Sequence, residues 1–208
     1  MTEPNRISLC QPASPTGKRL GRYWFKQTIQ VVTALCLSIG AGSNASAEKA
    51  DSKKEAVIEA GHGTTDNKTN VSKLSHGVEL TRGTLKIVAD NGTSAELSDG
   101  SIHTILYGVA GAQVHFKQKR DGGKDLWIEG WCDRAEYNEK TELVKFISNA
   151  KVRYLEGSTV TKELSGEFLA YDSREDVFVG TNSKSGTHQD GGGKIRIVIS
   201  PRKEAGNE

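Results

Sequence analysis

Short runs in which every second residue is apolar dominate the chain from Val71 to Ser200. Such alternation is seen at Val78 and Leu80, Leu85 and Ile87, Val114 and Phe116, Leu126 and Ile128, Val152 and Tyr154, and Ile195, Ile197 and Ile199. A period of two over a few residues is typical of a strand that buries one face. We find no window of ten or more residues with helical spacing, so the sequence predicts an all-β fold.

Glycine follows an acidic or amide residue between many of these runs, at Asn91-Gly92, Asp99-Gly100, Asp121-Gly122 and Asp190-Gly191. These pairs supply the positive φ angles that tight hairpin turns require. Proline would interrupt a strand ladder, and Pro201 is the only proline after residue 47. We therefore expect consecutive strands to pair antiparallel.

The alternating runs recur at a regular distance, because Val78, Val114 and Val152 lie 36 and 38 residues apart in similar surroundings. Each copy continues into a strand that ends in a small residue and an acid, at Ala89-Asp90, Cys132-Asp133 and Gly166-Glu167. The pattern predicts a strand-only unit of about 35 to 40 residues, stacked roughly three times. Such a sheet buries its apolar faces by folding over itself, which leaves strand edges open at its ends.

The first 47 residues have the organisation of a secretory signal peptide. A basic region precedes the apolar run Ile29 to Gly42, which is shorter than the roughly 20 residues of a membrane-spanning helix, and Ala45-Ser46-Ala47 follows it. We expect export and cleavage after Ala47. Residues 48–70 are polar and are expected to be flexible, with part of them able to form an edge strand. The folded domain is predicted over 71–200, followed by a C-terminal tail, 201–208.

The remaining composition argues against several functions. Residues 48–208 contain 23 Lys and Arg against 25 Asp and Glu, so nucleic acid is not an expected partner. No serine-hydrolase elbow or phosphate-binding loop is present. We predict neither an enzyme nor a cofactor, although a small hydrolase with a site assembled from distant residues remains an alternative. A metal site is not predicted either, since no paired ligand motif connects the five histidines, His62, His76, His103, His115 and His188.

Cys132 is the only cysteine after the leader, so the exported chain cannot form an internal disulfide. It occupies the small-residue position that Ala89 and Gly166 fill in the other copies, which favours a packing role over a nucleophilic one. Six basic residues are candidates for phosphate contacts at a groove rim, but such a scatter is usually a solvated face. No phosphate-binding residue is therefore predicted among Arg82, Lys86, Lys117, Lys119, Arg120 and Lys124.

Three segments carry a resemblance to a known family: GVELTRGTLKIVAD (77–90), GWCDRAEYNEKTELVKFISNAKVRYLEG (130–157) and SGEFLAYDSREDVFVG (165–180). In this order they resemble the OstA-like repeats of the LptA family of periplasmic lipopolysaccharide-transport proteins, over nearly all of 71–200. The resemblance implies an antiparallel OstA-like β-jellyroll, a twisted, V-shaped sandwich with open strand edges. It also implies a location in the periplasm.

The resemblance further implies a non-catalytic bridge that carries lipopolysaccharide from the inner to the outer membrane for outer-membrane assembly. The implied partners are the lipid A acyl chains of lipopolysaccharide, an LptC-like inner-membrane component, an LptD-like outer-membrane translocon, and further copies of the chain joined head to tail. The alternative is an exported β-sandwich scaffold with a filled core and no lipid cargo.

The family's lipid-contacting positions correspond to the inward-facing residues of the matching strands. These are Val78, Leu80, Leu85, Ile87, Val114, Phe116, Ile128, Phe146, Val152, Tyr154, Leu164, Tyr171, Val177 and Val179. Alternation selects the same residues, and it equally describes an ordinary core. The last run is long and β-branched, which predicts pairing with another chain's strand through the edge that contains Ile195, Ile197 and Ile199.

Overall fold

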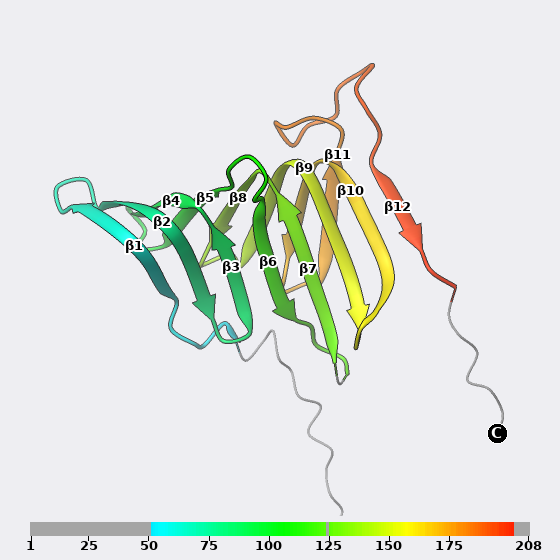
Figure 1. Cartoon of the computed structure of the whole chain (residues 1–208), viewed down its shortest axis with the longest axis horizontal. Coiled ribbons are helices and arrows are strands. Elements are labelled where there is room, and N and C mark those ends of the chain that lie inside the picture. Colours follow the sequence, from blue (N-terminus) through cyan, green and yellow to red (C-terminus); the bar gives the residue numbers. More distant parts are fainter. Residues whose placement is uncertain (1–50, 124, 202–208) are drawn as a thin grey trace, which may run out of the picture. The chain divides into compact units, whose positions relative to one another are not determined.

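The computed structural model describes residues 51–123 and 125–201, so the expected signal peptide and residues 202–208 of the expected tail lie outside the described residues. The described residues form twelve strands (Figure 1): β1 (Val57–Asp66), β2 (Val71–Arg82), β3 (Leu85–Ala89), β4 (Asn91–Glu96), β5 (Ile102–Tyr107), β6 (Val114–Lys119), β7 (Leu126–Cys132), β8 (Arg134–Asn138), β9 (Leu143–Glu156), β10 (Thr159–Asp172), β11 (Val177–Thr181) and β12 (Arg196–Ile199). The predicted all-β class is confirmed.

The strands pair antiparallel in the order β11-β10-β9-β7-β6-β3-β2-β4-β5-β8. Because β8 also pairs with β9, the eight strands from β9 to β8 in this order form a closed ring. Four strands extend the ring on its outside: β1 pairs with β2, β10 pairs with β9, and both β11 and β12 pair with β10.

The ring is flattened into two layers, with β3, β6 and β7 in the front layer of Figure 1 and β4, β5 and β8 behind them. Three long strands bend so that each belongs to both layers. Residues 71–74 of β2 pair with β4, whereas residues 78–82 pair with β3. At the bend, His76 and Gly77 have φ angles of 64° and 81°, a conformation that most residues avoid and that turns the strand.

The other two long strands bend in the same manner. In β9, residues 143–147 pair with β8 and residues 151–156 with β7, and Ser148 and Asn149 between them have positive φ angles. In β10, the register shifts between Gly166 and Phe168. The first half of β10 therefore extends the front layer with β12, and the second half extends the back layer with β11.

The repeat predicted from the valines corresponds to one passage through both layers. Each copy starts in the front layer, and its small residue and acid stand where the chain passes to the back layer, as at Ala89-Asp90 between β3 and β4. Backbone hydrogen bonds run along this seam within a copy, from Gly77 N to Asp90 O (3.0 Å) and from Asp133 N to Ser148 O (3.0 Å). Gly108 N donates to Asp133 O (2.9 Å) and thereby joins the first copy to the second. The two layers are thus joined along one long side, and hairpin turns form the other.

The core lies between the layers, where aromatic rings from both make contact. Phe116 of the front layer meets Phe146 of the back layer edge to face, with ring centroids 5.2 Å apart. Gly130 makes this contact possible, because a Cβ atom at that position would lie 2.5 Å from a ring carbon of Phe146. Burying each large apolar side chain contributes about 1.5 to 3 kcal/mol, so this interface is the main source of stability.

The segment 48–70, expected to be flexible with part of it able to form an edge strand, contains such a strand among its described residues. Residues 57–66 form β1 and pair along nearly the whole of β2. Most side chains of β1 are exposed, so backbone hydrogen bonds rather than apolar burial hold the strand in place. That is why its sequence lacks the alternation that identifies the other strands.

Candidate functional site

The structure places twelve of the fourteen predicted lipid-contacting residues in the core between the layers. They are buried almost completely, with exposed fractions of 8% or less: Val78, Leu80, Leu85, Ile87, Val114, Phe116, Ile128, Phe146, Val152, Tyr154, Leu164 and Tyr171. Burial alone does not make these residues a ligand site, because every side chain of a filled core has the same property.

Val177 and Val179 do not face the interior, so the expected inward orientation of these two residues is wrong. Their side chains are 50% and 56% exposed. Phe178 between them is the cross-strand partner of the inward-facing Tyr171, and the two rings stack with centroids 4.5 Å apart. Since cross-strand partners point to the same face of a sheet, the orientation of Tyr171 turns Phe178 inward and its two neighbours outward.

The interior surface does not end at the core. Two rows of cross-strand partners run through the front layer from β6 through β7, β9 and β10 to β12, and every member of a row points to the same face. The first row is Phe116, Gly130, Val152, Leu164 and Ile197, and the second is Gln118, Ile128, Tyr154, Lys162 and Ile199.

The first row changes from buried to exposed at its last member, and the second row changes after Tyr154, through the half-buried Lys162. Leu164 is 8% exposed, but its partner Ile197 is 54% exposed, and Ile199 at the end of the second row is 72% exposed. We name the interior-facing surface of Tyr154, Leu164, Phe178, Ile197 and Ile199 the C-terminal trough. Because this apolar surface is open to solvent and continuous with the core, the trough is the candidate site for an apolar ligand.

Cationic groups stand beside the ring of Tyr154 in the trough. The guanidinium carbon of Arg120 lies 4.4 Å from the ring centroid, and Nζ of Lys162 lies 4.6 Å from it. Arg120 also forms an ion pair with Asp176, with Nε 3.2 Å from Oδ1. Within 51–123 and 125–201, Lys162 forms no ion pair with a carboxylate.

Arg120 and Arg82 each connect a front-layer hairpin to a back-layer hairpin. The guanidinium group of Arg82 is nearly buried and donates hydrogen bonds to Tyr137 Oη (3.1 Å) and to the carbonyl oxygens of Glu139 (3.0 Å) and Lys54 (3.1 Å). It also donates to the carbonyl oxygen of Ser52. The segment from Asp51 to Lys54 therefore covers the hairpin side of the sandwich near β2.

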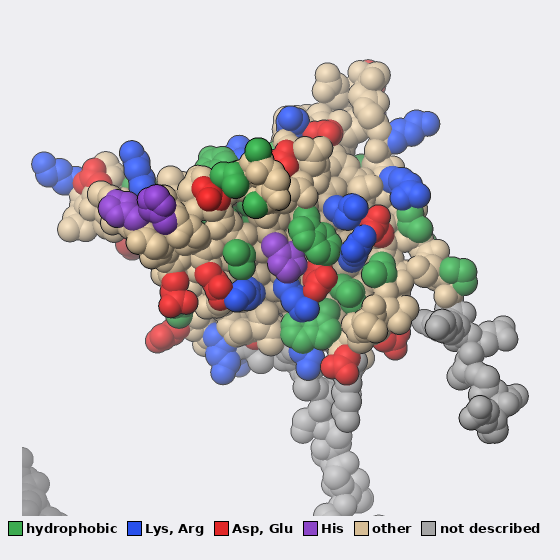
Figure 2. Space-filling view, in the orientation of Figure 1, with side chains coloured by type: hydrophobic (Ala, Val, Ile, Leu, Met, Phe, Trp, Pro, Cys, Tyr) green, Lys and Arg blue, Asp and Glu red, His purple; other side chains and the backbone are tan. Residues whose placement is uncertain are grey.

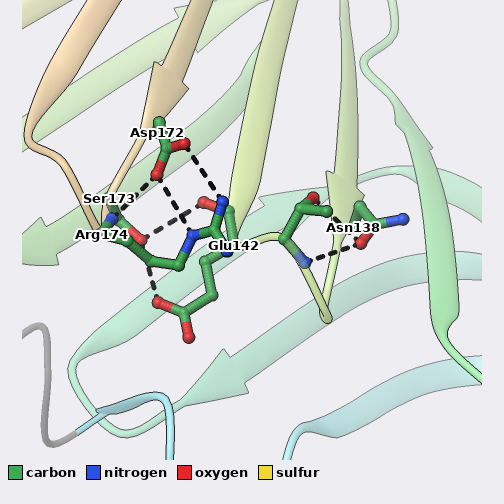
Figure 3. A network of polar contacts seen from close by, with 6 residues as sticks. Asn138, Glu142, Asp172, Ser173 and Arg174 are labelled. Carbon is green, nitrogen blue, oxygen red and sulfur yellow. Dashed lines mark hydrogen bonds and ion pairs between the residues drawn. The ribbon is translucent and has the colours of Figure 1, made fainter.

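The back-layer turns on this side are themselves cross-linked by polar contacts (Figure 3). The N–H of Ser173, in the turn after β10, donates to the carbonyl oxygen of Glu142 (3.4 Å), and its hydroxyl donates to the same oxygen (3.3 Å). Asp172 accepts a hydrogen bond from the N–H of Arg174 (3.0 Å), and Asn138 accepts one from Thr141 N (2.9 Å). These contacts hold the rim to which the arginines bind.

β12 presents an unpaired edge, because β10 is its only strand partner among the described strands. Ser200 N donates to Thr161 O (3.0 Å), and hydrogen-bonded pairs alternate with non-hydrogen-bonded pairs along an antiparallel ladder. The N–H groups of Ile197 and Ile199 therefore point away from β10. Ile195, the third residue predicted for edge pairing, precedes β12 and lies close to Gly166 and Gly180.

The outer face of the front layer mixes charged and hydrophobic side chains (Figure 2). Trp131 stacks on His115 with ring centroids 5.2 Å apart, and the guanidinium carbon of Arg153 lies 5.4 Å from the Trp131 ring. Arg153 also forms an ion pair with Glu163 (2.8 Å). Burial lowers the pKa of His115, which keeps its ring neutral at neutral pH.

Cys132 has the properties of a packing residue, as the repeat predicted. Its side chain is fully buried, and burial raises the pKa of its thiol to about 12. In the described residues, no three His, Cys, Asp or Glu side chains are grouped as metal ligands would be. The same residues contain no helix with the length and hydrophobicity of a membrane span.

Sequence reasoning missed the position of Lys162 within the interior row. The register shifts between Val160 and Lys162, so Val160 pairs with Leu155 on the outer face and Lys162 pairs with Tyr154 on the inner face. The signal was present nevertheless, because Lys162 stands two residues before Leu164 and therefore shares its parity.

Comparison with known proteins agrees with this architecture. Residues 57–177 match the family model described as LptA/(LptD N-terminal domain) LPS transport protein. Among solved structures, the chain resembles LptH, the LptA-homologous periplasmic component of the lipopolysaccharide transport device of Pseudomonas aeruginosa, with a TM-score of 0.61 and 20% identity. The match covers 73% of this chain and 99% of LptH, and it confirms the predicted jellyroll fold. No curated protein sequence gives a significant match.

Proposed function

We propose, since the chain belongs to the LptA/LptD N-terminal domain family of lipopolysaccharide transport proteins, that it is a periplasmic bridge component that binds lipopolysaccharide and carries it from the inner to the outer membrane. Its family is one of non-enzymatic transport components, and a role in lipopolysaccharide transport follows from membership.

The observation that carries the proposal is the continuation of the interior surface into the C-terminal trough. The rows that end at Ile197 and Ile199 begin in the dry core, so an acyl chain that covers the exposed isoleucines extends the core without a break. Each CH₂ group removed from water contributes about 0.8 kcal/mol. The buried residues of both rows, such as Phe116 and Ile128, would contact acyl chains only if the front and back layers move apart.

Lipid binding in the trough can be tested with one pair of matched variants. Ile197 faces the trough and Val179 faces outward, yet the two side chains are almost equally exposed, at 54% and 56%. We expect Ile197→Asp to lower the affinity for lipopolysaccharide at least about tenfold, because a carboxylate cannot be buried under acyl chains without a partner. Val179→Asp introduces the same charge and should leave binding unchanged. Fluorescence titration with labelled lipopolysaccharide measures both, and equal losses in the two variants would contradict the proposal.

The unpaired edges supply the physical basis for the proposed partners. An edge strand can accept a strand from another chain through main-chain hydrogen bonds. β1 and β12 extend the ring at opposite ends of the view in Figure 1, and each has one described strand partner, which suits a head-to-tail chain of copies. The terminal copies would pair in the same way with an LptC-like component at one end and an LptD-like translocon at the other.

Edge pairing can be separated from trough binding by the choice of substitution. Ile197→Pro removes an N–H that points away from β10, so it should reduce the concentration-dependent self-association without loss of the sheet. Ile197→Ala shortens the same side chain and keeps the N–H, which makes it the matched control. Analytical ultracentrifugation of residues 48–208 measures the oligomer, and circular dichroism measures the sheet. An oligomer of unchanged size in the proline variant would count against pairing through β12.

A scaffold without lipid cargo is the second candidate function, and the tight burial of the twelve interior residues favours it. This reading requires the core to stay filled and the trough to be covered by protein alone. Wild-type protein that self-associates yet takes up no lipopolysaccharide, from an envelope fraction or when it is added, would support the scaffold over the bridge. Native mass spectrometry distinguishes the two results directly.

A further inference from the structure

Lys162 is the one charged residue in the two interior rows, whose other members carry apolar side chains apart from Gln118 and Gly130. The register shift at Thr161 brings it there, opposite Tyr154 on one side and Ile199 on the other. Its ammonium group lies over the Tyr154 ring, and its neighbours on the interior face are the buried Leu164 on the same strand and the solvent-exposed Ile199 across the ladder. Lys162 therefore stands at the boundary between the apolar trough and water.

The neighbouring cations differ from Lys162 in having carboxylate partners. Arg120, which shares the Tyr154 ring, is paired with Asp176, and Arg153 on the outer face of the same layer is paired with Glu163. In the part of the chain that the structure describes, no acidic side chain forms an ion pair with Lys162. The trough thus combines an exposed apolar surface with an uncompensated positive charge at its rim.

These two features together match the chemistry of an anionic amphiphile. A surface lysine ordinarily lays its stem on apolar surface and leaves its head group to water. At this rim, however, the head group stands where the polar end of a lipid must lie if its chains cover Ile197 and Ile199. A phosphate group carries about 1.5 to 2 negative charges and accepts strong, charge-assisted hydrogen bonds from an ammonium group.

We propose that Lys162 binds the phosphate group of a phosphorylated lipid whose acyl chains lie along Ile197 and Ile199. This inference rests on the proposed function, in which the trough binds lipid, and it names the group that orients the lipid there. Arg120 stays paired with Asp176 and stabilises the position of the Tyr154 ring, against which the ammonium group of Lys162 rests.

The test compares two lipids and three variants of residues 48–208. The lipids are lipid A with its phosphates and the same lipid A after dephosphorylation. Lys162→Met keeps the length of the stem and removes the charge, whereas Lys162→Arg keeps the charge. The matched control is Lys151→Met, because Lys151 lies on the outer face of β9 between the buried Ala150 and Val152. Urea unfolding of each variant verifies that the fold is intact.

We expect Lys162→Met to bind phosphorylated lipid A about tenfold more weakly than wild type, which is the usual loss for one charge-assisted hydrogen bond. Dephosphorylated lipid A should bind wild type and Lys162→Met equally, and Lys162→Arg and Lys151→Met should retain wild-type affinity. Equal losses for both lipids, or equal losses in Lys162→Met and Lys151→Met, would overturn the assignment.

Two further outcomes separate this inference from its premise and from a simpler ligand. If wild type binds neither lipid, the proposed function fails and the inference fails with it; if wild type binds both lipids and Lys162→Met matches it throughout, only the inference fails. Millimolar inorganic phosphate is the probe for a free-anion site. Displacement of lipid A by inorganic phosphate would overturn a lipid-specific site, and the absence of displacement would support it.

Discussion

Replacement of Arg82 by methionine should be among the most damaging single substitutions outside the core. Methionine keeps most of the apolar stem and removes the guanidinium group, which makes four hydrogen bonds. Two of these bonds reach the carbonyl oxygens of Ser52 and Lys54, and the other two reach Tyr137 and Glu139 of the back layer. One side chain therefore holds both layers and the N-terminal segment together.

The magnitude follows from how many of the freed partners water can reach. A hydrogen bond to a charged group is worth about 1.5 to 3 kcal/mol, but the three carbonyl oxygens are only partly buried and regain water. The bond to Tyr137 is buried, so its hydroxyl loses a partner without replacement. We expect a loss of about 3 kcal/mol, the lower end for breaking a buried charged network. At an m-value of about 2 kcal/mol/M, the urea midpoint would fall by about 1.5 M.

Equilibrium unfolding in urea, followed by circular dichroism, measures this loss on residues 48–208. Arg174→Met is the control, because Arg174 pairs with Asp172 at an exposed turn, where an ion pair contributes little to stability. Deletion of residues 48–54 should remove part of the Arg82→Met effect, since two of the four acceptors leave with that segment. A midpoint for Arg82→Met that equals that of Arg174→Met would refute the reasoning.

Three other perturbations have clear expected results. Cys132 should not react with a maleimide until the protein unfolds, because burial raises the pKa of its thiol from 9.0 to about 12. The free energy of unfolding should fall as pH rises between these two values. Rapid labelling of the native protein would disprove the burial. Burial lowers the pKa of His115 below 6.5, so on acidification the imidazole of the unfolded chain is protonated before that of the folded chain. The free energy of unfolding should therefore fall as pH decreases below 6.5. NMR titration of the His115 ring, which stacks on Trp131, measures its pKa, and a value above 6.5 would contradict the prediction. Gly130→Ala should lower the free energy of unfolding by about 1 to 3 kcal/mol, because the new Cβ atom overlaps with Phe146. Combining it with Phe146→Leu should recover part of this loss in urea unfolding. Strictly additive losses in the double variant would contradict the overlap.

Alternation was sufficient to predict the fold class, because most strands bury one face only. Among the predicted turn pairs, Asn91-Gly92 is the exception, since it lies at the start of β4 and has no positive φ angle. Val78, Val114 and Val152 mark equivalent starts of a copy, and each is buried in the front layer. The small residue and acid at the end of the second strand of a copy coincide with the passage between layers. Two levels of the sequence, a period of two and a period near 37, thus encode the strand faces and the return of the chain to the same layer.

The misplaced residues share a different cause, which is the absence of alternation. In β11 the sequence reads Val177-Phe178-Val179, so both parities are apolar and the pattern alone assigns neither to the interior. Pairing with Tyr171 decides the matter, and that pairing is set by the register of a neighbouring strand. β1 is the opposite case, since its polar side chains are mostly exposed and only backbone pairing identifies it as a strand.

A sequence pattern also cannot separate a filled core from a trough, because the two differ in what covers them and not in residue type. Leu164 and Ile197 are partners in one row and equally apolar, yet one is covered and the other is open. The difference arises because β12 extends the front layer of the sheet while β11 pairs with the other half of β10, in the back layer. A second copy that pairs with the free edge of β12 would extend the front layer again and lengthen the apolar surface, so edge pairing and lipid binding would support each other at the same strand.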